Sequence, residues 1–238
     1  MGTGPSLAKI TAHAKYLLDD FIQLRERYEL LHPMLFDQEV VNQYHNANQA
    51  RGFAVLRRSL FLTCCQDIVK LTRDEDERNP SMYRIMEDMA SPEIMDELRQ
   101  RNCDAELWCE RQETDPTLAA IYRAREPDLI AKYRNEFDHK YEKAIAFWPK
   151  LKDCPTVKDC MRIRHKITAH TEVDRKTLKP IDISTLDITY GDLKPTIDDM
   201  QTLVEMISQL VRSSSFAWEQ LDRLTTTAAY GFWRNKAV

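Results

Sequence analysis

Residues 161–170 gather side chains that could act on a phosphate group: two arginines, one lysine and two histidines. A histidine has an ordinary pKa near neutrality, so it can accept or donate a proton under cellular conditions. An arginine is always charged, and its planar fork matches the oxygens of a phosphate. Together these residue types predict cleavage of RNA without a metal ion. A histidine would move the proton of the attacking 2′-hydroxyl, and an arginine would neutralise the phosphoryl oxygens.

Positive charge also concentrates around this segment. From Lys150 to Lys179 there are nine Lys or Arg and four Asp or Glu, a net charge of +5. The whole chain carries −4, so the rest of the protein is acidic. A locally basic segment on an acidic protein favours an anionic ligand at that segment.

The element that must position these side chains is a helix over about residues 157–170, capped at Thr156. Arg164 and His170 are six residues apart, which is roughly 600° in an α-helix, so they lie about 120° apart around its axis. They therefore do not pair within one helix. They can meet if the helix ends between them, or if a second copy of the chain brings its own pair across an interface. Steps of three and four predict a buried seam on the same helix: Cys160, Ile163 and Ile167.

The spacing of arginine and histidine does not by itself select a nuclease. Arg27 and His32, and likewise Arg134 and His139, have a similar spacing. His170 also fits a simpler interpretation, in which a histidine at a helix C-terminus is favoured by the helix dipole and has solvated basic neighbours.

Composition favours a helical fold. The chain has 238 residues, 43% apolar and 30% charged, with only five glycines. Few glycines and many helix-forming residues predict an all-α helical bundle, a single domain over residues 1–238, and there is no internal repeat or alternating strand pattern. No apolar run approaches the roughly 18 residues of a membrane span, and the N-terminus lacks a signal-peptide pattern, so a cytoplasmic protein is expected.

Apolar periodicity and proline positions set the expected helix bounds. The residue before a proline is disfavoured in the α region, so Pro33 is expected to end the first helix near Leu31. Pro127 is expected to open a long helix, and Pro149 and Pro155 to bracket a linker after it. The expected helices before the histidine-bearing one span residues 6–31, 38–46, 48–72, 80–90, 92–112 and 127–147.

Residues 73–126 are expected to form an acidic helical insertion. Asn79–Pro80 and Ser91–Pro92 each fit an N-cap followed by a proline at the first helical position. Residues 73–115 hold fourteen acidic residues and six arginines, a net charge of −8. That composition is typical of a solvated face, and the alternative is a partner surface or a rim that repels RNA.

The histidine-bearing helix, a loop and a final core helix are expected over residues 156–212. Residues 171–187 are polar and predicted to be extended, and Thr189 and Asp192 fit a capping box in its acidic variant. A continuation of the final helix past Ser213 to Leu224 stays open. Its core-facing stripe is predicted from regular steps of three and four: Leu193, Ile197, Met200, Val204, Ile207 and Val211.

No metal or other cofactor is expected. The six cysteines are predicted to be reduced and mostly buried. Two candidate metal-ligand patterns also occur in the sequence. The spacing of Cys154, Cys160, His165 and His170 matches no common zinc module. Glu-x-x-His pairs typical of di-iron bundles also occur, but each needs a further glutamate from another helix; they are Glu29 with His32, and Glu136 with His139.

The heptapeptide Arg164–His170, with the sequence Arg-His-Lys-Ile-Thr-Ala-His, resembles the arginine–polar–x–histidine motif of HEPN domains. Its Arg-polar-Lys-x-x-Ala-His form is similar to the AbiU2-like, abortive-infection branch of that superfamily. The order of motif helix, loop and long final core helix is also similar, as is the helix around residues 60–74. The resemblance covers most of the chain loosely and one heptapeptide closely, and His165 stands where asparagine is commoner.

The resemblance implies an α-helical, usually dimeric domain that acts as a metal-independent endoribonuclease in a toxin–antitoxin or phage-defence system. It implies catalytic roles for Arg164 and His170, whose two copies would face each other across a homodimer. His165, Lys166 and Arg162 would support RNA binding. The partners expected are RNA, a second copy of the chain and an antitoxin, with no membrane.

A non-catalytic helical module that binds RNA or a protein partner is the alternative function. Its support is the acidic segment 73–115 and the aromatic C-terminal region, for which packing of a terminal helix is the simpler interpretation. The aromatic residues concerned are Trp218, Tyr230, Phe232 and Trp233.

Overall fold

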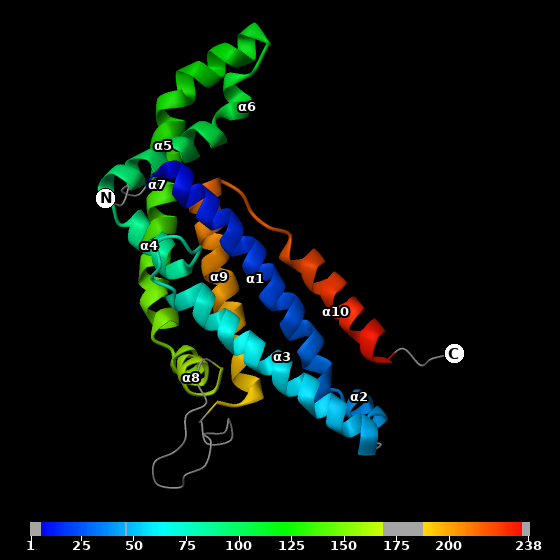
Figure 1. Ribbon diagram of the computed structural model, residues 1–238. Helices are drawn as coiled ribbons and strands as arrows, with labels where there is room; N and C mark the ends of the chain where they lie inside the picture. The colour runs from blue at the N-terminus through cyan, green and yellow to red at the C-terminus, as the bar shows by residue number, and fades with distance from the viewer. Residues whose placement is uncertain (1–5, 46, 169–187, 235–238) are drawn as a thin grey trace.

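The computed structural model describes residues 6–45, 47–168 and 188–234, and these ranges contain helices and no β-strand (Figure 1). The expected all-α fold is thus confirmed. The helices are α1 (Leu7–Phe36), α2 (Gln38–Gln43), α3 (Ala47–Arg73), α4 (Met82–Met89), α5 (Pro92–Glu106), α6 (Trp108–Arg111), α7 (Pro116–Lys152), α8 (Pro155–Ile163), the π-helix η1 (Arg164–Thr168), the 3₁₀ turn η3 (Tyr190–Asp192), α9 (Leu193–Arg212) and α10 (Trp218–Arg234).

Helix α1 is the centre of the bundle. It packs against α3, α9 and α10, while α7 packs against α5 and α9 (Figure 1). Its core face follows the predicted period, and Leu17, Phe21 and Leu24 are fully buried. Burial of such a stripe removes apolar area from water, which is the main favourable term in folding.

The prediction that α1 ends before Pro33 is wrong. Ser6 caps the helix by accepting the Lys9 N–H at 3.3 Å, but the helix then continues through Pro33 to Phe36. Packing outweighs the missing N–H, because Pro33 is buried and Met34 joins a small core with Val40 and Trp233.

Helix α7 also runs through prolines that were expected to bound it. It begins at Pro116, where Asp115 accepts the N–H groups of Thr117 and Leu118 at 2.8 and 3.0 Å. It passes Pro127 and Pro149 and ends at Lys152, so residues 149–155 are not a linker. Its direction changes between the projecting start and the part that packs on the bundle (Figure 1).

The caps of α4 and α5 were predicted with mixed success. Ser81, and not Asn79, caps α4 and accepts the Arg84 N–H at 3.1 Å. Asn79 is engaged inside the loop instead, where its side-chain N–H donates to Asp74 at 3.0 Å. Ser91 with Pro92 does open α5, as predicted, but the helix expected over 92–112 is interrupted at Leu107.

The acidic stretch supplies part of the core as well as charged surface. Apolar side chains of α4 and α5 are buried in the main cluster of the bundle, and most of the acidic residues are exposed, with Asp88 as a buried exception. Beyond Leu107, α6 and the start of α7 project from the bundle (Figure 1). The buried residues concerned are Met82, Ile85, Met86, Met89, Ile94, Met95 and Leu98.

Helix α9 matches the prediction closely. Thr189 donates its backbone N–H and its hydroxyl to Asp192, at 2.6 and 2.8 Å, which forms the expected capping box. The six stripe residues from Leu193 to Val211 are all buried. The helix ends at Ser213, whose φ of 49° lies in the left-handed region, so α10 is a separate helix.

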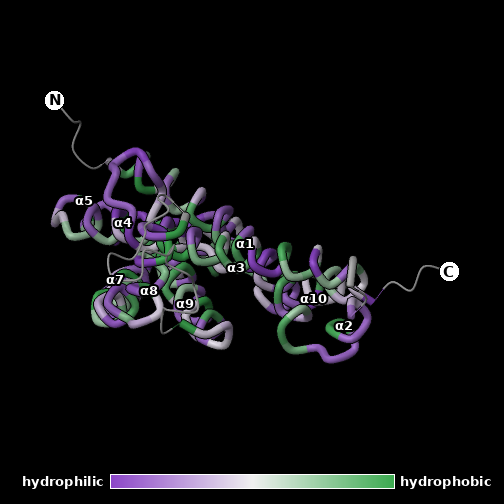
Figure 2. The backbone as a smooth tube through the Cα atoms, turned by 60° about the horizontal axis from the view of Figure 1, so that its bottom comes forward, coloured by the Kyte–Doolittle hydropathy of each residue, from purple (hydrophilic) through white to green (hydrophobic). Residues whose placement is uncertain are grey.

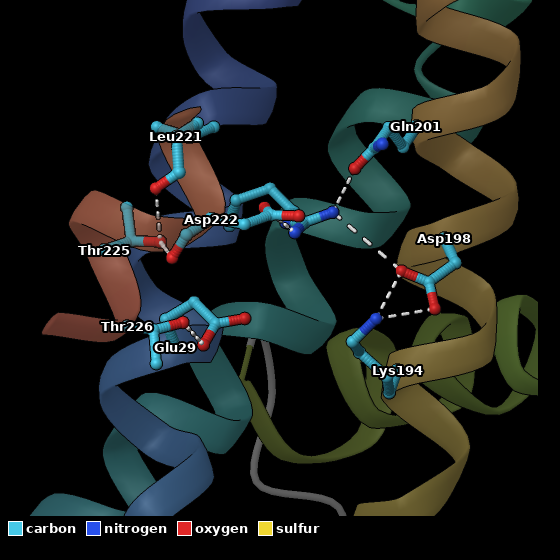
Figure 3. Close-up of polar contacts among 9 residues, drawn as sticks. Glu29, Lys194, Asp198, Gln201, Leu221, Asp222, Thr225 and Thr226 are labelled. Carbon is cyan, nitrogen blue, oxygen red and sulfur yellow. Dashed lines mark hydrogen bonds and ion pairs between the residues drawn. The ribbon is translucent and has the colours of Figure 1, made fainter. Parts of the chain in front are cut away.

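A buried cation ties α10 to the bundle. The Arg25 side chain is only 4% exposed and donates to Gln201 on α9 and Asp222 on α10. Asp198 lies 3.8 Å from the same guanidinium, and it also pairs with Lys194 at 2.6 Å (Figure 3). Because Arg25 is buried with carboxylates on both sides, its desolvation is offset and three helices are held together.

Candidate functional site

The segment that carries the motif is not a continuous α-helix. Helix α8 begins at Pro155, after Cys154 as the N-cap, and it ends at Ile163. From Arg164 to Thr168 the backbone forms a π-helix. The predicted start near Thr156 and the predicted α-helix through residue 170 are therefore wrong. The angle of about 120° between Arg164 and His170 does not apply, because a π-helix holds more residues in each turn.

Helix α8 is anchored on α3 by buried small and apolar side chains. Val157, Cys160 and Ile163 are fully buried, which confirms the predicted seam, and Ile167 is half-buried against the same core. Cys65 on α3 and Cys160 on α8 interact in the core, and this interaction, together with burial, raises the pKa of the Cys65 thiol. Helix α8 thus packs directly against α3.

The cysteines are free thiols, as predicted from the sequence. Four are buried: Cys64, Cys65, Cys103 and Cys160. Burial, and the carboxylate of Asp67, raise the pKa of Cys64 to about 12. Its thiolate is therefore scarce at neutral pH, and Cys64 serves as a core side chain.

The basic side chains of the motif are more exposed than the buried residues of the seam. Arg162, Arg164 and His165 are exposed, and Lys166 is half-buried. Arg162 pairs with Asp159 at 2.7 Å, so part of its charge is neutralised within α8. Ile163, which directly precedes Arg164, is buried, so the backbone next to Arg164 is packed against the core.

His170 lies outside the described residues, as does the stretch 171–187 that was expected to be extended. The structure thus places Arg164, His165, Lys166 and Arg162 on one exposed stretch. The pairing of Arg164 with His170 stays a prediction.

Among the described residues, no three His, Cys, Asp or Glu side chains lie together as ligands for one metal ion. Cys160 of the zinc pattern faces Cys65 in the core. In the first di-iron pattern, Glu29 accepts the Thr226 hydroxyl at 3.1 Å, and the His32 ring lies between Tyr28 and a second aromatic ring, that of Phe36.

Helix α3 and η3 add residues near the motif that sequence reasoning missed. Tyr190 is 37% exposed, and its ring meets the buried Phe61 ring edge-on, with centroids 4.8 Å apart. The Arg57 guanidinium lies over the Tyr190 ring, 5.9 Å from its centroid. The available signal was the position of Tyr190 inside the capping box between Thr189 and Asp192.

The motif lies at the same end of the molecule as the start of α9, and both lie next to α3. Helix α8 contacts both α3 and α9, and η1 contacts α3. Figures 1 and 2 both show α8 close to α9 and far from α10.

The C-terminal aromatic residues are mostly packed. The Trp218 indole N–H donates to Glu205 at 2.9 Å and its ring contacts Phe21. Trp233 is buried and donates to the Leu30 carbonyl at 2.8 Å. Phe232 is 61% exposed. Most of the aromatic residues in this region therefore pack α10 against the rest of the bundle.

No helix within the described ranges combines the length and the apolar character needed to cross a bilayer. Comparison with curated proteins and with solved structures gave no significant match. The family model described as AbiU2, a HEPN family, matches residues 7–226, which include nearly the whole helical bundle and the motif. The chain therefore belongs to the AbiU2 family of HEPN proteins.

Proposed function

We propose that this chain is a metal-independent endoribonuclease of an abortive-infection, phage-defence or toxin–antitoxin system, acting in the cytoplasm. The observation that carries the proposal is the placement of Arg164. It is exposed at the turn where α8 becomes a π-helix, directly after the fully buried Ile163. π-helical turns inside helices are frequent at functional sites. The Arg164 guanidinium is thus attached to a backbone segment that packs against α3.

In the proposed reaction His170 takes the proton of the 2′-hydroxyl as O2′ attacks the adjacent phosphorus. Arg164 stabilises the negative charge that grows on the phosphoryl oxygens. The bond from phosphorus to the 5′-oxygen breaks, and that oxygen receives a proton from a general acid. The products are a 2′,3′-cyclic phosphate and a 5′-hydroxyl.

The proposed enzyme is a homodimer in which two motifs face one RNA strand. Single exposed cations attract phosphates weakly, whereas two facing copies of the motif double the local positive charge. Lys166 would contact a phosphate, and His165 would support the site through a polar contact. Arg162, already paired with Asp159, would act mainly by adding positive charge near the strand.

Incubation of the purified chain with single-stranded RNA in EDTA tests the nuclease. We expect cleavage that leaves 2′,3′-cyclic phosphate ends. Arg164→Ala and His170→Ala should each slow it by roughly 100-fold or more, because each removes a group used in the transition state. Arg223→Ala, at an exposed position of α10, is the matched control and should cleave normally.

Circular dichroism and the thermal midpoint must show that both motif variants keep the fold. Cleavage at the control rate in both Arg164→Ala and His170→Ala would contradict the site assignment. Growth arrest on expression, relieved by the same substitutions, would connect the activity to toxicity.

The second candidate is a non-catalytic module that binds a protein partner such as an antitoxin. It is favoured by exposed apolar side chains on the part of the chain that projects beyond Leu107. Trp108 is 64% exposed there, and Leu118 and Ile121 on α7 are also exposed. Toxicity that survives His170→Ala but is lost with Trp108→Ser would favour this function over the nuclease.

A further inference from the structure

Tyr190 is an exposed aromatic side chain that the fold nevertheless holds in place. Its backbone lies between Thr189 and Asp192, whose capping hydrogen bonds of 2.6 and 2.8 Å fix the turn. Its ring and that of Phe61, which is only 1% exposed, meet at a steep angle with their centroids 4.8 Å apart. Arg57 lies over the ring, 5.9 Å from the centroid. A solvent-facing ring fixed in this way loses little conformational freedom when a flat ligand stacks on it.

The same ring lies near the motif because both are attached to α3. Arg57, Phe61 and Cys65 are four residues apart in turn, so they lie on one face of α3. Cys65 is the residue that meets Cys160 of α8. At 1.5 Å per residue, Arg57 is about 12 Å along α3 from that anchor point. A strand that follows α3 from the motif toward the N-terminal end of that helix would therefore meet Tyr190.

We propose that Tyr190 and Arg57 form a stacking platform for an unpaired base of the RNA strand whose phosphate is held at Arg164. This inference rests on the proposed function and adds to it a pair of residues that bind a base. Unpaired bases stack on tyrosine rings and on guanidinium planes, whereas paired bases are shielded within a duplex. The platform thus selects loops and single strands.

The charges around the platform favour RNA over an acidic peptide. Arg57 and the exposed Arg58 stand on α3, and Arg164 and Lys166 stand on the neighbouring segment. Phosphates spaced along a strand can meet cations on both elements while a base occupies the ring between them. A peptide would use the cations but has no need of a tyrosine ring held for stacking.

The test uses the full chain and two oligonucleotides of equal length. One is a fluorescent 2′-O-methyl oligouridine, which cannot be cleaved because it lacks the attacking hydroxyl. The other is its abasic counterpart, which keeps every phosphate and lacks every base. Anisotropy titrations at one salt concentration give the affinity of each for the wild type, Tyr190→Leu, Tyr190→Phe and Arg57→Gln. Tyr230→Leu is the matched control, because Tyr230 also has an arginine, Arg234, over its ring but lies on α10.

Stacking on Tyr190 predicts that Tyr190→Leu weakens oligouridine binding roughly 5- to 100-fold. Binding of the abasic strand should change by less than about twofold, and Tyr190→Phe and Tyr230→Leu should bind like the wild type. Arg57→Gln should weaken both strands, because it removes a cation as well as a stacking plane. Unchanged oligouridine affinity in Tyr190→Leu overturns the platform, and so does an equal loss for both strands.

Two further measurements keep the result interpretable. If Tyr190→Leu does not fold, as judged by its thermal unfolding, the wild type is instead photo-crosslinked to a strand that contains 5-iodouridine. A crosslink map that omits Tyr190 overturns the proposal. RNA cleavage by the wild type is measured in parallel. Cleavage without a Tyr190 effect rejects only the platform, whereas a wild type that neither binds nor cleaves RNA rejects the proposed function with it.

Discussion

At the scale of single residues, His13 is a buried histidine that has cations close to it. It lies on α1, and Asp88 and Arg84 of α4 pair with each other nearby at 2.6 Å. Burial lowers the pKa of His13, and Lys9 and Arg84 lower it too, against a raising effect of Asp88. The folded protein therefore keeps His13 neutral at pH values where an exposed histidine would already be charged.

This arrangement predicts a loss of stability on mild acidification. The unfolded chain has a histidine pKa of about 6.5, whereas the folded value is lower, so below that pH the unfolded state binds the proton first. The free energy of unfolding should fall by at most about 1.4 kcal/mol per pH unit from this residue, beginning near pH 6.5. Urea denaturation from pH 7.5 to 5.5 measures it. His13→Gln should have a flatter profile, and identical slopes would exclude His13 as the cause.

At the scale of elements, the helix bounds predicted at the prolines of α1 and α7 are the main predictions that were wrong. A proline in a helix interior removes an N–H, so the carbonyl four residues earlier lacks its helical donor. The positions affected are Glu29 in α1 and Arg123 and Ile145 in α7. Sequence rules for proline include the loss of this hydrogen bond. They do not include the burial of Met34 or Leu151 after the proline, because that burial depends on helices distant in sequence.

Pro127 should locally weaken α7, since it is exposed and near the projecting start of the helix. Pro127→Ala restores a donor for the Arg123 carbonyl, and proline costs about 3 kcal/mol relative to alanine in a helix interior. We expect amide hydrogen exchange over residues 117–126 to slow by roughly tenfold or more. Pro116→Ala is the control, because a proline at the first helical position removes no helical hydrogen bond. Equal exchange in both variants would contradict a local weakening of α7 by Pro127.

Those parts of the candidate site that depend on residues close together in the sequence could be predicted from it. The heptapeptide pointed to Arg164, and the seam through Cys160 and Ile163 followed from helical periodicity. The π-helix did not, because a change of backbone hydrogen bonding leaves no periodic mark over five residues. Tyr190 was missed because its placement depends on a contact with Phe61, a residue 129 positions earlier in the chain.

At the scale of the whole molecule, the bundle keeps its motif and its projecting part apart. Helix α8 and η1 lie at one end, while α6 and the start of α7 extend from the other (Figure 1). A partner bound to the projecting part would therefore not cover α8 and η1.

Mixing two inactive variants tests whether the proposed site is shared between two copies. If Arg164 of one copy works with His170 of the other, a mixed dimer of Arg164→Ala and His170→Ala contains one intact site and one doubly defective site. Random assembly would make half of the dimers mixed and restore roughly a quarter of wild-type cleavage. Co-expression with two affinity tags isolates the mixed dimer. A mixed dimer without activity would place both residues of a working site in the same copy.

The attachment of both the motif and Tyr190 to α3 has a consequence for how freely the chain can vary. Cys160 is anchored through Cys65, and Tyr190 through Phe61, so the two meet α3 by separate contacts. Their spacing is therefore set by α3 and not by the length of the chain that joins them. A substitution that shifts α3 between Phe61 and Cys65 should thus move the motif and Tyr190 relative to each other.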